Sequence, residues 1–144
     1  MQNYDLYLRG GIPVIPTVTT TSGWLYEHIG SNDRGYVGFV MQGDTSGHPI
    51  GMELHGICRI DTSHQFAFGD PIFWIRESGA RHQMSSTFGT INGFLTDDST
   101  LGSWIGTSMR EWQRSYCEPG CTDSTVMGWT TMMLNQTEKG VYGG

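Results

Sequence analysis

The sequence has few charged side chains, very few cations and no long apolar run. Charged residues make up 15% of the 144 residues and hydrophobic residues 37%, against about 25% and about 45–50% in typical globular domains. Only eight residues are Lys or Arg, scattered along the chain, and the net charge is −6, which disfavours binding to a phosphate backbone. No apolar run approaches the roughly 20 residues of a membrane-spanning helix, and residues 1–11 lack the basic and apolar regions of a secretory signal. We therefore expect no nucleic-acid partner, no membrane partner and synthesis in a cytoplasm.

Cysteine is also scarce, with three residues in the chain. Cys58 falls on the inward side of an alternating segment, which predicts a small buried side chain. Cys117 and Cys121 bracket Glu-Pro-Gly, so an oxidised pair would close a tight local loop, whereas a reducing compartment would keep both thiols reduced. No second Cys or His pair lies near them, so the spacing gives little support for a zinc site.

The usual sequence motifs of catalysis are missing. The chain has no Gly-x-Ser-x-Gly nucleophile elbow, no glycine-rich phosphate loop and no His-Glu-x-x-His metal motif. Asp97 and Asp98 are adjacent in a turn, so their side chains point apart and cannot readily work as a paired acid and base. We expect no catalytic residue.

The histidines do not form a short metal-ligand motif either. They lie in or beside different turns and strands, at His28, His48, His55, His64 and His82. We expect neither a metal nor another cofactor. The alternative is a metal-dependent β-barrel enzyme, in which the fold would gather His55, His64 and His82 with Asp61 or Asp70.

Glycine, by contrast, is abundant, and the apolar segments between turns are short. Twenty-one glycines are about twice the usual share, and eight or more β-like segments recur at spacings of roughly 8–12 residues. The expected fold is all-β: a single compact β-barrel, β-tulip-like or sandwich domain of short antiparallel strands, with extended terminal arms and little helix. We expect an N-terminal arm at 1–11, a β domain at 12–134 and a flexible C-terminal tail at 135–144. Within the domain, 110–124 is expected to be an inserted loop or a short helix, because Met109, Trp112 and Tyr116 have helical spacing.

The stretch Gly51–Arg76 has the clearest strand pattern. From Met52 to Asp61 one set of alternate residues is mainly apolar, which predicts a strand with one buried face. Ile72–Ile75 is a second, short apolar strand that starts directly after a proline, a residue tolerated at the first position of a strand. We assign Phe66 and Phe68, which lie between these strands, to the core, and Trp74 of the second strand as well. Gly69 and Asp70 are assigned to a turn. Asp70 precedes proline, which is typical of a turn former rather than a catalytic carboxylate.

Aromatic residues suggest a second alternative, a carbohydrate-binding module. The chain has five tryptophans and six tyrosines, and flat aromatic rings can stack on sugar rings. Each tryptophan lies within or next to an apolar segment, however, so we expect most of them to be core or interface anchors. These tryptophans are Trp24, Trp74, Trp104, Trp112 and Trp129.

Several short motifs, in order, resemble the small head-decoration (capsid cement) proteins of tailed bacteriophages. The segment from Tyr4 to Ile12 is similar to that family's opening, and Tyr36–Val40 is similar to its Gly-Val-Ala strand. Gly51–Ile60 and Gly69–Trp74 resemble its central strand and its Gly-Asp-x-Val-Tyr-Trp step. Leu101–Ser108 resembles the strand near the family's end, after which this chain inserts residues 110–124. The resemblance covers most of Tyr4–Met109 as a pattern of motifs rather than as identity.

The resemblance implies a mechanical role without catalysis. Proteins of this family sit on the outer surface of the expanded icosahedral head, commonly as trimers, and clamp major capsid subunits against packaged-DNA pressure. The expected partners are therefore the major capsid protein and other copies of the chain, and the expected location is the outside of the virion after synthesis in the bacterial cytoplasm. We expect the N-terminal segment to dock on the capsid or on a neighbouring protomer through Tyr4, Leu6, Ile12 and Val14, since extended arms add strands to sheet edges.

Overall fold

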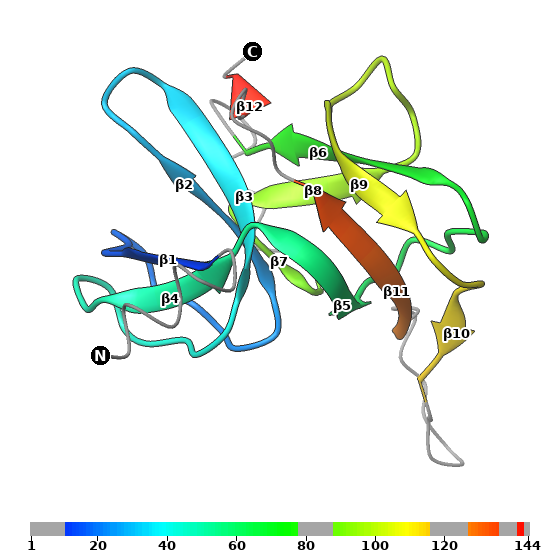
Figure 1. Cartoon of the computed structure of the whole chain (residues 1–144), viewed down its shortest axis with the longest axis horizontal. Coiled ribbons are helices and arrows are strands. Elements are labelled where there is room, and N and C mark those ends of the chain that lie inside the picture. Colours follow the sequence, from blue (N-terminus) through cyan, green and yellow to red (C-terminus); the bar gives the residue numbers. More distant parts are fainter. Residues whose placement is uncertain (1–10, 78–87, 116–126, 136–140, 143–144) are drawn as a thin grey trace.

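The chain is a pair of β-sheets. The computed structural model describes residues 11–77, 88–115, 127–135 and 141–142, and this part of the chain contains twelve strands and no helix. The strands form two six-stranded sheets, A and B (Figure 1). The all-β fold expected from the short, glycine-bounded apolar segments is confirmed.

Sheet A has the order β1-β4-β3-β2-β7, with β12 beside β3. Neighbouring strands are antiparallel, except that β2 and β7 are parallel. The segment after residue 11 contains Pro13 and Pro16, which lack a backbone donor and so predict a sheet edge or an extended arm. The edge position is confirmed, because in the described chain β1 pairs only with β4. The strands are β1 (Gly11–Val14), β2 (Leu25–Ile29), β3 (Arg34–Val40), β4 (Ile50–Glu53), β7 (Thr90–Ile91) and β12 (Val141–Tyr142).

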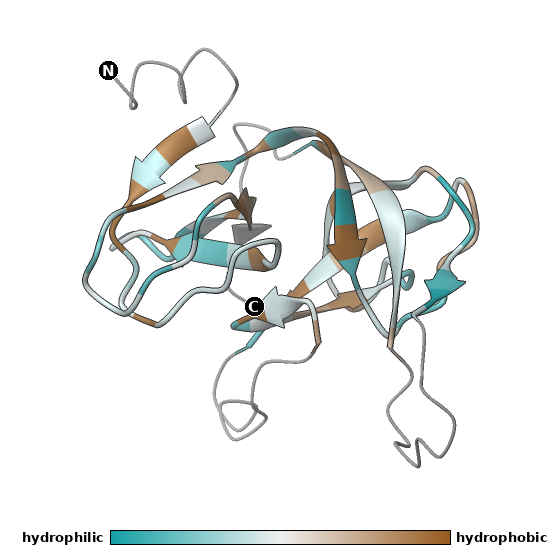
Figure 2. Cartoon of the chain, turned by 90° about the horizontal axis from the view of Figure 1, so that it is seen from below, coloured by the Kyte–Doolittle hydropathy of each residue, from teal (hydrophilic) through white to brown (hydrophobic). Residues whose placement is uncertain are grey.

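Sheet B is wholly antiparallel and curls into half a barrel (Figure 2). Its order is β10-β11-β9-β6-β8, and β5 pairs with the other side of β11. The register of β6 against β9 shifts between Ile72 and Phe73, which marks a β-bulge. The strands are β5 (His55–Asp61), β6 (Pro71–Arg76), β8 (Gly93–Thr96), β9 (Ser103–Ser108), β10 (Gln113–Arg114) and β11 (Gly128–Asn135).

The strand expected at 51–61 is shared between the two sheets. Leu54 separates β4 of sheet A from β5 of sheet B, and Gly56 has a φ of 122°, which glycine adopts without steric cost. On β5, Cys58 and Ile60 lie opposite buried residues of β11, whereas Ile57 is on the outer face and exposed. The predicted alternation is therefore confirmed, although the single continuous strand is not.

Two hydrophobic clusters form the core. One joins the sheets and is centred on Trp74 and Phe66, and the other lies among β1, β2, β3, β4 and β7 of sheet A. Their buried members are Leu25, Val37, Ile60, Phe66, Ile72, Trp74, Ile105, Met132 and Leu134 in the first cluster, and Val14, Tyr26, Val40, Ile50, Met52 and Ile91 in the second.

The helical turn expected from residue 110 is wrong over 110–115. Gln113 and Arg114 form β10 against β11. The backbone N–H of Trp112 donates to the carbonyl of Phe66, and its indole N–H donates to the carbonyl of Thr62 at 2.8 Å. These long-range bonds hold Trp112 beside the 62–66 segment in an extended stretch of chain. Residues 116–124 lie outside the described residues.

The expected tail at 135–144 is also wrong in part. Asn135 is the last residue of β11, and Val141–Tyr142 pair with Gly35 and Arg34 of β3. The backbone of β3 offers hydrogen-bonding groups on this side, and β12 completes them. The rest of the predicted tail lies outside the described residues.

Candidate functional site

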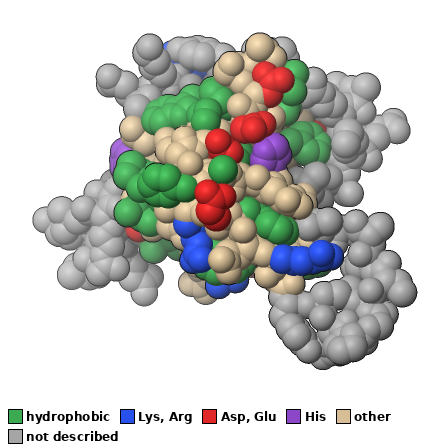
Figure 3. Space-filling view, turned by 90° about the vertical axis from the view of Figure 1, so that its right-hand side faces the viewer, with side chains coloured by type: hydrophobic (Ala, Val, Ile, Leu, Met, Phe, Trp, Pro, Cys, Tyr) green, Lys and Arg blue, Asp and Glu red, His purple; other side chains and the backbone are tan. Residues whose placement is uncertain are grey.

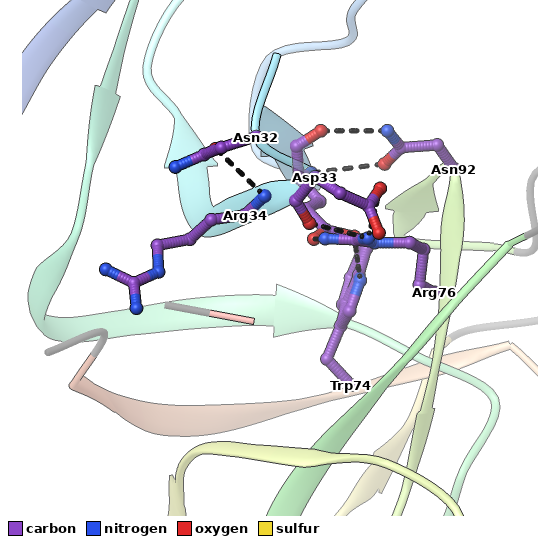
Figure 4. Close-up of polar contacts among 7 residues, drawn as sticks. Asn32, Asp33, Arg34, Trp74, Arg76 and Asn92 are labelled. Carbon is purple, nitrogen blue, oxygen red and sulfur yellow. Dashed lines mark hydrogen bonds and ion pairs between the residues drawn. The ribbon is translucent and has the colours of Figure 1, made fainter. Parts of the chain in front are cut away.

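A buried polar network joins the two sheets. Glu27 of β2 is fully buried, at 0% exposure, and its carboxylate accepts a hydrogen bond from the indole N–H of Trp74 at 3.0 Å. Arg76 donates to the same carboxylate from Nε at 3.0 Å and from Nη2 at 2.6 Å (Figure 4). Both oxygens of the buried carboxylate therefore have donors, as a charge in the interior requires.

Arg76 extends the network to the β2–β3 turn. Its Nη1 donates to the backbone carbonyl of Asp33 at 3.0 Å and to the Asp33 carboxylate at 3.1 Å. The hydrogen bonds with Glu27, and then the charges of Glu27 and Asp33, raise the pKa of the Arg76 guanidinium, while burial opposes this shift. Arg76 therefore remains a cation at any pH at which the chain is folded.

Asn92 ties the backbone of β2 to the β7–β8 corner. Its amide accepts from the Glu27 N–H at 3.1 Å and donates to the Glu27 carbonyl at 2.8 Å. Asn92 and Asp33 have φ values of 53° and 65°, and Asn and Asp tolerate this left-handed conformation better than most residues. A side-chain carbon at Gly35 would overlap the Glu27 carboxylate, so glycine is required there.

Chemically, this network is a tie between sheets. Trp74 and Arg76 both donate to the carboxylate of Glu27, which is fully buried. Sequence reasoning missed it. The available signal was the alternation of the two strands. Glu27 falls on the same inward face of β2 as Leu25, and Arg76 falls on the same inward face of β6 as Trp74.

A cleft of about 250 Å³ lies near one end of sheet B. His64 stands at it, with Nε2 3.5 Å from a carboxylate oxygen of Asp97 and its ring stacked at an angle on Phe66. The two threonine hydroxyls of the cleft are engaged, since that of Thr62 accepts from the backbone N–H of His64 and that of Thr90 donates to a carbonyl. The lining residues are Thr62, Ser63, His64, Phe88, Thr90, Phe94 and Leu95.

The proposed metal ligands are not brought together in the described part of the chain. There, no group of three or more His, Cys, Asp or Glu side chains is placed to hold a metal ion. His55 is exposed at the start of β5, and His64 pairs with Asp97 instead. His82 lies outside the described residues.

The residues assigned to the core and the turn have mixed outcomes. Phe66 and Trp74 are buried, as predicted. Phe68 is wrong as a core residue, because its side chain is 63% exposed. Gly69, with a φ of 88°, and Asp70, whose carboxylate accepts from the backbone N–H of Ala67, close a turn that leaves Phe68 outside the core. The predicted turn role of Asp70 is confirmed, and its carboxylate bonds to the backbone of Ala67, three residues earlier in the chain.

The expected docking arm is corrected in its second half. Val14 is buried in the second core cluster, and Ile12 packs against that cluster opposite Met52. Val14 is therefore part of the core and is closed to a partner, whereas Ile12 is half-buried and its docking role stays a prediction. Tyr4 and Leu6 lie outside the described residues, as do Cys117 and Cys121 with their possible disulfide.

The tryptophans divide between core and surface. Trp74 is fully buried, while Trp24 packs against the second cluster. Trp129 of β11 has the guanidinium carbons of Arg59 and Arg110 over its ring, at 4.1 and 4.2 Å. Trp104 is exposed on β9. Among the described residues, Trp104 is therefore the tryptophan most open to a sugar ring.

The comparisons with known proteins add no relative. The chain matches no protein-family model, no curated protein and no solved structure. Among the described residues, the structure also has no helix that is long and apolar enough to cross a membrane.

Proposed function

We propose that the chain is a structural decoration (cement) protein of a tailed-bacteriophage head. In this proposal it is made in the bacterial cytoplasm and binds the outer surface of the expanded icosahedral capsid. Its partners are the major capsid protein and two further copies of itself in a trimer. The proposal needs neither a catalytic residue nor a cofactor.

The observation that carries the proposal is the ordered set of motifs that resemble this family. They fall on successive structural elements: Tyr36–Val40 in β3, Gly51–Ile60 in β4 and β5, Gly69–Trp74 at the start of β6, and Leu101–Ser108 around β9. A motif glycine meets a local requirement, because a side-chain carbon at Gly106 would overlap the backbone of β11. The motifs thus mark the framework of the sheets.

The packing of the chain supports a load-carrying role. The Glu27–Arg76 pair connects strands 49 residues apart in the sequence and crosses from one sheet to the other. Such cross-links resist separation of the sheets, because pulling Arg76 away would leave a buried carboxylate without its cation. On a capsid, many symmetric copies would make weak individual contacts strong together.

The decisive experiment is quantitative mass spectrometry of gradient-purified particles from the source. We expect the number of copies of this chain to stand in a simple ratio to the number of major capsid subunits, as icosahedral symmetry requires. We also expect particles that lack this chain to be less resistant to heat. Absence from purified particles would refute the proposal.

A carbohydrate-binding module is the second candidate, and the exposed Trp104 favours it. Trp104 pairs with Phe73 across β9 and β6, so two aromatic side chains lie side by side on the outer face of sheet B. This candidate predicts a change in tryptophan fluorescence on addition of glycans that is lost in Trp104→Ala. No change across a glycan panel would remove it.

A further inference from the structure

The outer face of β5 and β11 combines exposed apolar and cationic side chains. Its alternating partners on the inner side, Met132 and Leu134 among them, are buried in the core. The outer positions therefore point away from the half barrel. We call this surface the β5–β11 face and define it by Ile57, Arg59, Arg110, Trp129 and Met133.

Two large apolar side chains lie at one end of this face. Ile57 and Met133 are directly opposite each other in the β5–β11 register, and they are 66% and 43% exposed. Single exposed apolar residues are ordinary, but a cross-strand pair forms a continuous apolar contact area. Covering this pair would remove apolar surface from water, which favours association.

Two arginines held by Trp129 lie at the other end. Arg59 comes from β5, and Arg110 comes from the connection between β9 and β10 on the other side of β11, so the Trp129 ring receives a guanidinium from each side. Stacking on an indole attracts each cation and restricts its motion. Less conformational entropy is then lost when the guanidinium binds a ligand.

Neither arginine is neutralised within the described chain. Asp61 lies opposite Trp129 in the register, yet no carboxylate of the described residues forms an ion pair with Arg59 or Arg110. The Nε of Arg110 is buried and has no hydrogen-bond acceptor among those residues. Because this nitrogen is buried, a partner carboxylate would meet the outer guanidinium nitrogens of the arginines instead.

We propose that the β5–β11 face binds the protein partner of this chain, and that the partner presents carboxylates beside an apolar contact. This inference rests on the proposed function, in which the partner is the major capsid protein. Tryptophan, arginine and methionine are the side chains enriched at the energetic centres of protein interfaces. Guanidinium groups match carboxylates with two parallel hydrogen bonds, which adds geometric selectivity.

Charge favours this occupant over a two-fold dimer through the same face. A two-fold axis along the face would place the arginines of one copy against those of the other, and like charges across an interface are repulsive. A two-fold axis across the face would place the arginines on the Ile57 and Met133 side chains of the other copy, which offer no carboxylate. The side of the molecule shown in Figure 3 carries both basic and acidic side chains, so it is the two arginines stacked on Trp129 that an acidic protein surface would complement.

The test compares two face variants with two matched controls in co-sedimentation with gradient-purified, nuclease-treated expanded heads. The face variants are Arg59→Gln/Arg110→Gln and Ile57→Ser/Met133→Ser. The controls are Arg114→Gln, which pairs with Gly128 and so points away from the face of Trp129, and Leu101→Ser, which is 57% exposed at the β8–β9 turn. Melting curves of all four should match the wild type, because the substituted apolar side chains are exposed.

We expect each face variant to bind heads about 30-fold more weakly, as for loss of an interface hot spot, and each control to bind within about threefold of wild type. Binding of the wild type should weaken as salt rises from 50 to 300 mM, and the double arginine variant should lose most of this dependence. The two variants remove different chemistry, so agreement between them supports one shared surface.

The failures are distinguishable. If the wild type does not sediment with heads, the proposed function fails and this inference fails with it. If the wild type binds and the face variants bind as the controls do, only the face assignment is overturned. A changed oligomeric state of the free face variants in sedimentation velocity would make the face a self-interface, and binding that requires DNA would make the occupant a nucleic acid; either result overturns the inference.

Discussion

Removing one partner of the Glu27–Arg76 pair should lower the free energy of unfolding strongly, because the other partner is then left as a buried charge without its counter-ion. Arg76→Met leaves the Glu27 carboxylate fully buried, with the Trp74 indole as its remaining side-chain donor in the described network. Uncompensated buried charges of this kind cost about 3–5 kcal/mol. The total stability of a domain is about 5–15 kcal/mol, so this single change should remove a large share of it.

The reverse change is milder but follows the same logic. Glu27→Gln keeps a side-chain oxygen for the Trp74 N–H and leaves Arg76 with the exposed Asp33 carboxylate. We expect a loss of about 3 kcal/mol, the lower end of the range for breaking a buried pair. In the double variant Glu27→Gln/Arg76→Met no buried charge is left alone. Its loss should be about 2 kcal/mol, which is below the sum of the single losses.

Urea denaturation followed by far-ultraviolet circular dichroism measures these free energies without relying on the fluorescence of Trp74. The double-mutant cycle should give a coupling of at least about 2 kcal/mol, at unchanged urea dependence of the unfolding free energy. Arg114→Met is the control for losing an exposed arginine, with an expected effect within about 0.5 kcal/mol. Single losses below about 1 kcal/mol, or a double loss equal to their sum, would refute the view that this pair ties the sheets.

Three further predictions concern other parts of the chain. In a Cys117→Ser/Cys121→Ser background, Cys58 should react slowly with a thiol reagent at pH 8, because burial raises its pKa to about 12. The thiol of the unfolded chain ionises near its ordinary pKa of 9.0, so the free energy of unfolding should fall by up to about 1.4 kcal/mol per pH unit from pH 9 to 12. Cys58→Ala should flatten that slope, and rapid reaction of the thiol in native buffer would place it at the surface. Phe66→Ala should cost about 3–5 kcal/mol, whereas Phe68→Ala should cost less than about 1 kcal/mol, and equal losses in urea denaturation would contradict the burial difference. Deleting residues 1–10 should abolish co-sedimentation with heads while leaving the melting temperature nearly unchanged; undiminished binding would exclude a docking role for that segment.

Local patterns were sufficient for the strands, because a strand's alternation is written in neighbouring residues. The inward positions Cys58 and Ile60 follow from period two alone. The edge position of β1 was likewise local, since proline removes a hydrogen-bond donor. These predictions required no knowledge of which strands become neighbours.

Where local patterns failed, a distant contact had overridden them. The spacing from Met109 onward suggested a helical turn, but the bonds of Trp112 to Phe66 and Thr62 keep the segment extended. Phe68 was expected in the core by its apolarity, yet the turn closed by Asp70 places it outside. One continuous strand at 51–61 was expected, and the division at Leu54 depends on the separate partners β3 and β11.

By itself, the sequence determined that this chain is an all-β domain, that Cys58 and Ile60 face inward, and that the proline-containing segment of β1 does not lie inside a sheet. Only the tertiary structure decided that Glu27 meets Arg76 and that Arg59, Arg110 and Trp129 stack together. The contacts join residues 49 positions apart in the Glu27–Arg76 pair, 70 in Arg59–Trp129 and 19 in Arg110–Trp129. Alternation fixes the direction of a side chain relative to its own strand, whereas the pairing and register of distant strands fix what that side chain touches.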